Sequence, residues 1–177
     1  MRRVEVQRWP AVPTAPNTIE GDTTNDLLIG LGGNDTFVGT SGFDTIVGGT
    51  GLNVPSGVDT VTYENLGAAV VVDLDAGTAD KDLGEQDLLY GIRNVVGTDL
   101  DDQITGDGLV NTLTGGLGSD TLDGGAGNDT LRGGLDDDQL LGVDGGEWGT
   151  ITLRPPFQAD YCQLSLAAPV CLSVPKE

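Results

Sequence analysis

The stretch from Gly115 to Leu141 reads GGLGSDTLD, GGAGNDTLR, GGLDDDQLL, three nine-residue units that follow one another without a gap. Every unit opens with two glycines and carries an acid at its sixth residue and a leucine at its eighth. We call these two positions the acid place and the apolar place. The opening glycines are Gly115, Gly124 and Gly133, the acids are Asp120, Asp129 and Asp138, and the leucines are Leu122, Leu131 and Leu140.

Units of the same kind lie upstream of this stretch. GTDLDDQIT and GDGLVNTLT directly precede it, and an earlier series from Gly21 reads GDTTNDLLI, GLGGNDTFV, GTSGFDTIV. Downstream, GVDGGEWGT keeps the length but has Glu147 at the acid place and Gly149 at the apolar place, so we expect the repeat to end there. The upstream acid places are held by Asp26, Asp35, Asp44, Asp102 and Asn111.

The fourth unit of the early series has two possible registers. Direct counting gives GGTGLNVPS, which puts Asn53 at the acid place and Pro55 at the apolar place. Proline lacks the N–H that a sheet requires, so this register is disfavoured. The string GVDTVT matches GFDTIV of the preceding unit. We therefore predict an insertion at 50–55, with Asp59 and Val61 at the two places, and keep Asn53 as the alternative.

Composition favours a cation-binding protein. The 177 residues include 28 acids, 8 bases, 29 glycines and no histidine, and the formal net charge is −20. This charge repels nucleic acid and anionic membranes, so neither is an expected partner. Aromatic residues make up only 5% of the chain, which is little material for an ordinary core. Such a chain tends to need a bound ligand in order to fold.

The repeat has the chemistry of a calcium loop. Glycine tolerates positive φ, so a six-residue glycine-rich loop can turn its carbonyl oxygens toward one point. The acid adds a charged oxygen, and calcium prefers six to eight oxygen ligands. The remaining three residues suit a short strand whose middle side chain points inward. We therefore expect loops that bind metal and strands that build the core.

Residues 60–96 depart from the period. The apolar run from Ala68 to Val72 predicts a buried strand, and the acidic segment from Asp73 to Asp87 predicts a solvated loop. Asp87 and Leu89 regain the spacing between acid place and apolar place. A calcium site in this segment is a weaker alternative, since the EF-hand pattern of glycine and terminal glutamate is absent. Its acids would be Asp73 with Asp75, and Asp80 with Asp82 and Asp87.

The nonapeptide GGxGxDxUx resembles the calcium-binding repeat of the haemolysin-type (RTX) proteins. The resemblance implies an all-β fold, a right-handed parallel β-roll (a calcium-binding nonapeptide solenoid) in two repeat blocks joined by a non-repeat β spacer. It implies these divisions: N-terminal strand and linker at 1–20, first block at 21–62, spacer at 63–96, second block at 97–149, and a tail at 150–177 that caps the stack or is disordered.

In this family two units complete one coil, so the ligands of one ion come from units next but one to each other. The rule pairs Asp26 with Asp44, Asp35 with Asp59, Asp102 with Asp120, Asp120 with Asp138, and Asn111 with Asp129, with Gly115, Gly124 and Gly133 in the loops. Asn111 carries no charge, so its site should be the weaker. About five calcium ions would bind and reduce the net charge to about −10.

The resemblance also implies a function. We expect a secreted, extracellular or cell-surface module that folds on binding external calcium, with a structural, adhesive or folding-trigger role. The alternative is a C-terminal accessory module of a larger secreted enzyme, such as a protease, lipase or polysaccharide epimerase. A cell-surface or polysaccharide ligand is compatible with either, and we expect a monomer. RTX proteins are typically exported by type I secretion, and the first residues lack the apolar segment of a signal peptide.

No enzymatic activity is expected. Without histidine, the chain cannot form an HExxH zinc site or a Ser-His or Cys-His pair, and no GxSxG motif occurs. The longest apolar runs are too short to span a membrane. Cys162 and Cys171 lie in a glycine-free tail after Gly149 that does not resemble an RTX secretion signal, and a disulfide between them is left open.

Overall fold

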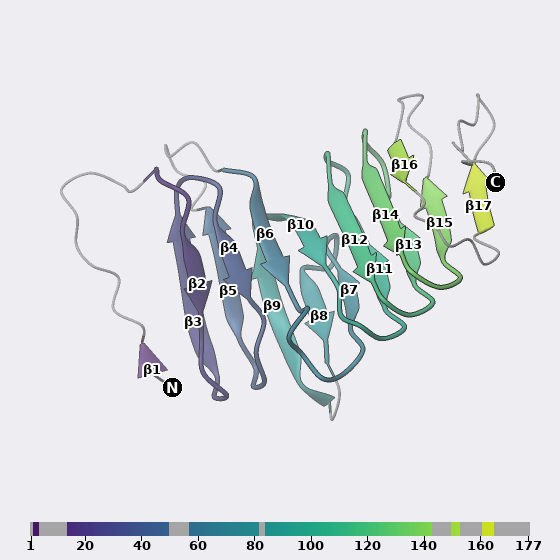
Figure 1. Cartoon of the computed structure of the whole chain (residues 1–177). Helices are drawn as coiled ribbons and strands as arrows, with labels where there is room; N and C mark the ends of the chain where they lie inside the picture. Colours follow the sequence, from purple (N-terminus) through teal and green to yellow (C-terminus); the bar gives the residue numbers. More distant parts are fainter. Residues whose placement is uncertain are drawn as a thin grey trace.

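The chain was analysed as a computed structural model. It describes the backbone of residues 2–3, 14–49, 57–81, 84–142, 150–152 and 161–164, and the side chains of 14–49, 57–81 and 84–142. The alternative acid Asn53, Glu147 and the cysteine side chains lie outside this part. The described residues contain no α-helix, which confirms the all-β class (Figure 1). No helix that could cross a membrane therefore occurs among them.

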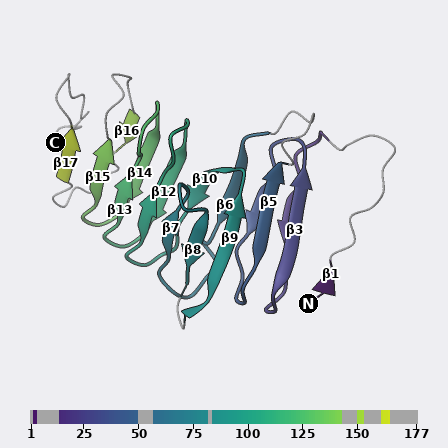
Figure 2. The same cartoon turned by 180° about the vertical axis from the view of Figure 1, so that it is seen from behind.

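The described strands form two sheets that lie face to face (Figures 1 and 2). The larger sheet contains, in spatial order, β1 (Arg2–Arg3), β3 (Asp26–Leu31), β5 (Thr45–Gly49), β9 (Gln86–Tyr90), β8 (Thr78–Asp80), β7 (Val71–Asp73), β11 (Gln103–Thr105), β13 (Thr121–Asp123), β15 (Gln139–Gly142) and β17 (Tyr161–Leu164). The smaller sheet contains β16 (Thr150–Thr152), β14 (Thr130–Gly134), β12 (Thr112–Gly116), β10 (Ile92–Val96), β6 (Asp59–Thr62), β4 (Thr36–Val38) and β2 (Thr18–Glu20).

In the repeats, successive strands alternate between the sheets. Each nonapeptide supplies one short strand, and its loop carries the chain to the other sheet. Neighbours within a sheet are therefore two units apart and run parallel, as β13 and β15 do in the larger sheet and β12 and β14 in the smaller. Leu122 pairs with Leu140, and Leu113 with Leu131, so equal places of the repeat stack on one another.

The apolar places build the core between the sheets. Within a three-residue strand only the middle side chain faces inward, as in β4 and β13, where Phe37 and Leu122 are buried between half-buried neighbours. This follows from the two-residue period of a strand. The buried apolar places are Leu28, Phe37, Ile46, Val61, Leu89, Ile104, Leu113, Leu122, Leu131 and Leu140.

The register of the fourth early unit follows Asp59, as predicted. Strand β6 begins at Asp59, and Val61 pairs with Phe37 of β4. The Val61 side chain is fully buried. Residues 50–56 therefore lie between two strands that keep the acid and apolar places in register.

The spacer differs from the prediction in two ways. Only Val70 and Val72 are buried in the predicted strand, because β7 begins at Val71 and alternates between solvent and core. The segment predicted as a solvated loop contains β8, which is antiparallel to both β7 and β9. Gly77, at φ +69°, lies in the turn between β7 and β8, where glycine permits the tight reversal. The larger sheet is therefore mixed at the spacer, and the expectation of a solvated loop over β8 is wrong.

Glycines keep the loops close together at two specific places. In the most regular units, glycines at the second and fourth places adopt positive φ, as at Gly116 (+138°), Gly118 (+94°) and Gly127 (+133°). Among the described residues, two that are not glycine share this conformation, Leu31 at a second place and Asp136 at a fourth. A Cβ on Gly118 would lie 2.6 Å from the carbonyl carbon of Leu100, in the loop two units earlier. Neither the backbone angle nor the space suits a side chain.

Replacing Gly118 by Ala should therefore destabilise the calcium-loaded protein. Positive φ alone costs a non-glycine residue roughly 1–2 kcal/mol, and the contact with Leu100 adds to it. Gly108 is the matched control, because a Cβ there would meet nothing within 4 Å. In thermal unfolding followed by CD, Gly118→Ala should lower the melting temperature clearly, while Gly108→Ala should change the free energy of unfolding by less than about 0.5 kcal/mol. Equal losses would show that loop stacking does not depend on this glycine.

Candidate metal centre

The acid places lie buried at the strand starts. Asp120, for example, is 1% exposed and directly precedes β13. Burying carboxylates is costly unless each oxygen finds a partner, so this arrangement needs compensation. All nine predicted ligands at acid places are buried: Asp26, Asp35, Asp44, Asp59, Asp102, Asn111, Asp120, Asp129 and Asp138.

A hydrogen bond joins each predicted pair of acid places. The backbone N–H of one residue donates to the Oδ1 atom of the acid two units on. The five distances from the backbone nitrogen to Oδ1 are 2.9 Å for Asp26 to Asp44, 2.8 Å for Asp35 to Asp59, 2.8 Å for Asp102 to Asp120, 2.9 Å for Asp120 to Asp138, and 2.9 Å for Asn111 to Asp129. The structure thus brings together all the pairs that the sequence predicted.

These pairs form two rows, one at each edge of the stack. Asp102, Asp120 and Asp138 precede strands of the larger sheet, whereas Asn111 and Asp129 precede strands of the smaller sheet. Asp120 is the middle member of its row: its N–H donates to Asp138 and its Oδ1 accepts from Asp102. If one cation lay between each two successive members of the row, Asp120 would contact two cations.

The second carboxylate oxygen gives the clearest sign that these residues fit a cation. In three of the acids Oδ2 is buried without any hydrogen-bond partner, namely Asp35, Asp59 and Asp120. An unsatisfied charged oxygen is much more costly to bury than a neutral one. A cation beside it would remove this cost.

At several opening glycines a carbonyl oxygen lies close to the side chain at the acid place. A Cβ on Gly115 would lie against Oδ2 of Asp120 and 2.8 Å from the carbonyl oxygen of Gly133, the opening glycine two units on. Gly97 repeats the arrangement with Asp102 and the Gly115 carbonyl oxygen. Gly124 and Gly133 likewise face the Oδ2 atoms of Asp129 and Asp138 in their own units. The opening glycines therefore leave room where a carboxylate and a carbonyl meet.

The donor set suits calcium better than a transition metal. The described residues contain no group of three acidic or cysteine side chains close enough to hold a metal by themselves. An ion here would combine one or two carboxylates with backbone carbonyl oxygens. Such an all-oxygen set with few charges matches a hard cation that accepts six to eight ligands at flexible geometry, which is calcium.

Burial shifts the protonation of these acids. It raises the pKa of the Asp120 carboxyl to about 8, and the charges of Asp102 and Asp138 add to the effect. Burial also raises the carboxyl pKa values of Asp44, Asp59, Asp102 and Asp129. Without metal, the fold thus favours the neutral form of groups that water would keep ionised.

The sequence pattern did not identify Asn17 as a member of these rows, and it left Asp87, which regains the repeat spacing, at the end of a predicted solvated loop. Asn17, assigned to the N-terminal linker, donates its N–H to Asp35 Oδ1 at 2.9 Å and so lies in register with the repeats. The spacing from Asn17 to Asp35, 18 residues, was the available signal. Asp87 is fully buried and accepts the Asp44 N–H at 2.9 Å, so the solvated loop predicted up to this residue is wrong there. Asp75 and Asp80 of the same segment are exposed, as expected.

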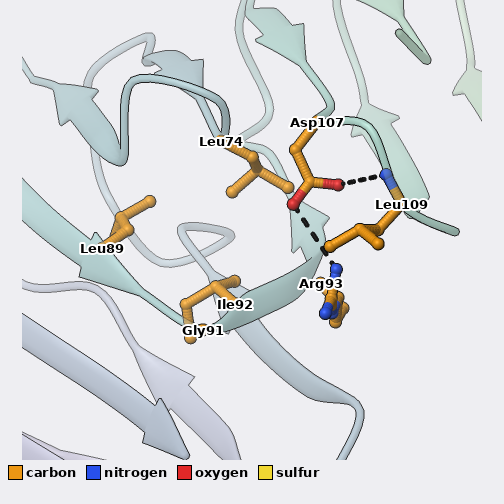
Figure 3. A pocket seen from close by; sticks show the side chains of 7 residues that line it. All are labelled: Leu74, Leu89, Gly91, Ile92, Arg93, Asp107 and Leu109. Atoms are coloured by element: carbon orange, nitrogen blue, oxygen red, sulfur yellow. Dashed lines mark hydrogen bonds and ion pairs between the residues drawn. The ribbon is translucent and has the colours of Figure 1, made fainter. Parts of the chain in front are cut away.

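A small hollow lies on the spacer side of the stack (Figure 3). Its polar groups satisfy one another: Asp107 accepts the Leu109 N–H at 2.8 Å through Oδ1 and an Arg93 Nη1–H at 3.5 Å through Oδ2. The hollow is therefore a gap in side-chain packing, and its charged groups are already paired with each other. It is lined by Leu74, Leu89, Gly91, Ile92, Arg93, Asp107 and Leu109.

In calcium-free buffer, acid should favour the folded chain. The pKa of Asp120 is about 8 in the fold against its ordinary value of 3.8, so the folded chain binds this proton more tightly. Stabilisation by protonation is then complete below about pH 4 and is lost as pH rises through about 8. Far-UV CD in EDTA should show more β-structure at about pH 5 than at about pH 8. Asp120→Asn, which does not titrate, should reduce this difference; an equal β signal at both pH values in the unaltered chain would contradict the assignment.

Comparison with known families agrees with this geometry. The family model described as RTX calcium-binding nonapeptide repeat (4 copies) matches residues 15–46, 38–54 and 105–140. The first match includes Asn17, and the last includes Asp120 and Asp138. Most of the paired acids thus lie in segments that match a calcium-binding repeat, whereas Asp59, Asp87 and Asp102 lie outside the matched residues. The chain therefore contains RTX calcium-binding nonapeptide repeats in these segments.

Proposed function

We propose that this chain is a secreted calcium-binding module that folds when it meets extracellular calcium. The observation that carries the proposal is the pairing of buried acids two units apart, with Oδ2 atoms that lack a partner in Asp35, Asp59 and Asp120. RTX repeats bind calcium, and the all-oxygen donor set of the loops fits that ion. The role that follows is structural: calcium turns a flexible acidic segment into a rigid stack.

Calcium is a requirement of this fold rather than an addition to it. Each nonapeptide buries one aliphatic or aromatic side chain, yet it must order nine residues, several of them glycine. Neighbouring carboxylates in a row also repel one another when no cation separates them. The free energy of metal binding therefore becomes free energy of folding, as in other small metalloproteins.

We further propose a right-handed parallel β-roll for the repeats, with calcium between next-but-one loops. The predicted ligand pairs would hold about five ions, and the uncharged Asn111 would give the weakest site. A calcium-free interior and a calcium-rich exterior would make the module fold only after export. Extracellular calcium modules typically bind in the range of roughly 10⁻⁴ to 10⁻³ M, which fits loops with only one or two charged ligands per ion.

A calcium titration followed by far-UV CD tests the proposal. In EDTA at about pH 7.5 the chain should be largely unfolded, and β-structure should appear with calcium because the metal neutralises the acid rows. Magnesium should substitute poorly, since it demands a tighter octahedral site. A β spectrum already complete in EDTA and unchanged by calcium would refute calcium-coupled folding.

Asp120 should contribute more to calcium-driven folding than Asp26. Asp120 lies between two partners of its row, whereas Asp26 has one predicted partner, Asp44. Asp120→Asn keeps an oxygen for the Asp102 N–H but removes the charge that two ions would share. It should raise the calcium midpoint by roughly tenfold or more, on the scale typical of altered metal surroundings, and Asp26→Asn should raise it less.

The control for this comparison is Asp137→Asn, which removes the same charge from an exposed position beside Asp138. Its calcium midpoint should stay within about twofold of the unaltered chain, because exposed charges interact weakly through water. If Asp120→Asn and Asp137→Asn shift the midpoint equally, net charge and not the buried row governs calcium binding.

A further inference from the structure

Lys81 differs from every other base whose side chain the structure describes, because it is buried. Its side chain is 1% exposed, and it follows β8 in the turn that leads to β9. The described parts of the repeats contain an exposed Arg132 but place no base in either carboxylate row. A lysine with so little exposure needs strong local partners.

The Lys81 ammonium has an all-oxygen environment. It donates to the carbonyl oxygens of Thr40 at 2.6 Å and Gly42 at 2.8 Å. It also donates to Oδ1 of Asp87 at 2.6 Å and lies 3.8 Å from Oδ2 of Asp44. Two carbonyls and two carboxylates thus surround one positive charge.

The partners of Lys81 are two backbone carbonyls of one repeat loop and the acids of two successive loops. In the unit GTSGFDTIV, Thr40 and Gly42 are the second and fourth residues and Asp44 is the acid place. Asp87 is the next acid of the row, and it accepts the Asp44 N–H at 2.9 Å as the repeat acids do. Lys81 therefore lies between two successive acids of a row.

The spacer holds this loop by further contacts. Glu85 accepts the Gly42 N–H through Oε2 at 2.9 Å, so the turn that carries Lys81 also supplies a counterpart for the loop backbone. Tyr63, whose side chain is fully buried, donates its hydroxyl to Oδ2 of Asp87 at 3.0 Å. Both oxygens of Asp87 are thereby partnered, in contrast to Asp59 and Asp120, each of which keeps an unpartnered oxygen.

We propose that the Lys81 ammonium is a built-in cation that takes the place of calcium between the Asp44 and Asp87 loops. This loop pair is closed without metal, and the first repeats are fixed to the spacer at a point that needs no calcium. The inference rests on the proposed calcium role of the other loop pairs. An ordinary buried ion pair would join Lys81 to a carboxylate, but it would not require the carbonyl oxygens of the second and fourth loop residues.

Calcium stoichiometry of three variants tests the proposal. Lys81→Ala removes the ammonium and leaves space among its four oxygens, so the chain should bind one more calcium than the unaltered protein. Lys81→Met fills the same space with an uncharged side chain and should gain none. Arg132→Ala is the matched control, because it removes a positive charge from an exposed place on β14 and should leave the number unchanged. Native mass spectrometry at saturating calcium counts the ions.

The outcomes separate this inference from the proposed function. If the unaltered chain binds calcium and Lys81→Ala binds the same number, the built-in cation is refuted while calcium binding stands. If the unaltered chain binds no calcium, the proposed function itself fails, and the inference fails with it. A gain of one ion in Lys81→Ala, absent in Lys81→Met and Arg132→Ala, supports the proposal.

A measurement on the unaltered protein covers the case in which the variants do not fold. Lys81 and Lys176 are the only lysines of the sequence, so ¹⁵N-lysine labelling gives two side-chain signals. In the calcium-loaded protein one ammonium should exchange its protons slowly with water, and its signal should show couplings to carbonyl or carboxylate acceptors. Rapid exchange of both ammonium groups would overturn the proposal.

Discussion

The fold depends on carboxylates that are buried in rows. Each acid place holds its side chain against the acid place two units away, and the N–H of one residue takes an oxygen of the next. This contact sets the register of the parallel strands, but it leaves negative charges stacked inside the molecule. In Asp35, Asp59 and Asp120 one oxygen has no protein partner. The buried carboxylate rows therefore need cations to balance their charge. The formal net charge of −20 shows the same excess of negative charge over the whole chain.

The other features serve these rows. Glycines at the second and fourth places adopt positive φ, which lets loops stack closely enough for carbonyl oxygens to approach the carboxylates. The apolar places form a narrow core of one side chain per unit between the sheets. The burial of one side chain per unit offsets little of the free energy that ordering a nonapeptide costs. Where the repeat stops, Lys81 supplies a charge from the chain itself, and the row continues through Asp87.

Much of this arrangement could be predicted from the sequence, because a nine-residue repeat fixes the spacing between the acid places and apolar places of successive units. The acid pairs followed from the resemblance to the RTX family, in which two units complete one coil, and the place of Asp59 followed from a matching string. The antiparallel strand β8 was missed, because its short TAD segment gives no period and its pairing depends on a turn at Gly77. The surroundings of Lys81 were missed for a similar reason: its carbonyl partners are Thr40 and Gly42, 41 and 39 residues away, and only the β8–β9 turn brings them together.

The most direct test of the central claim, that cations between buried acids hold the stack together, is anomalous diffraction from a crystal grown in calcium. We predict metal density between Asp102 and Asp120, between Asp120 and Asp138, and between Asp35 and Asp59, with carbonyl oxygens of the adjoining loops as further ligands. Density between Asp44 and Asp87 should be an amine and not a metal. Ordered repeats in which the Asp102, Asp120 and Asp138 row contains no metal would contradict the account.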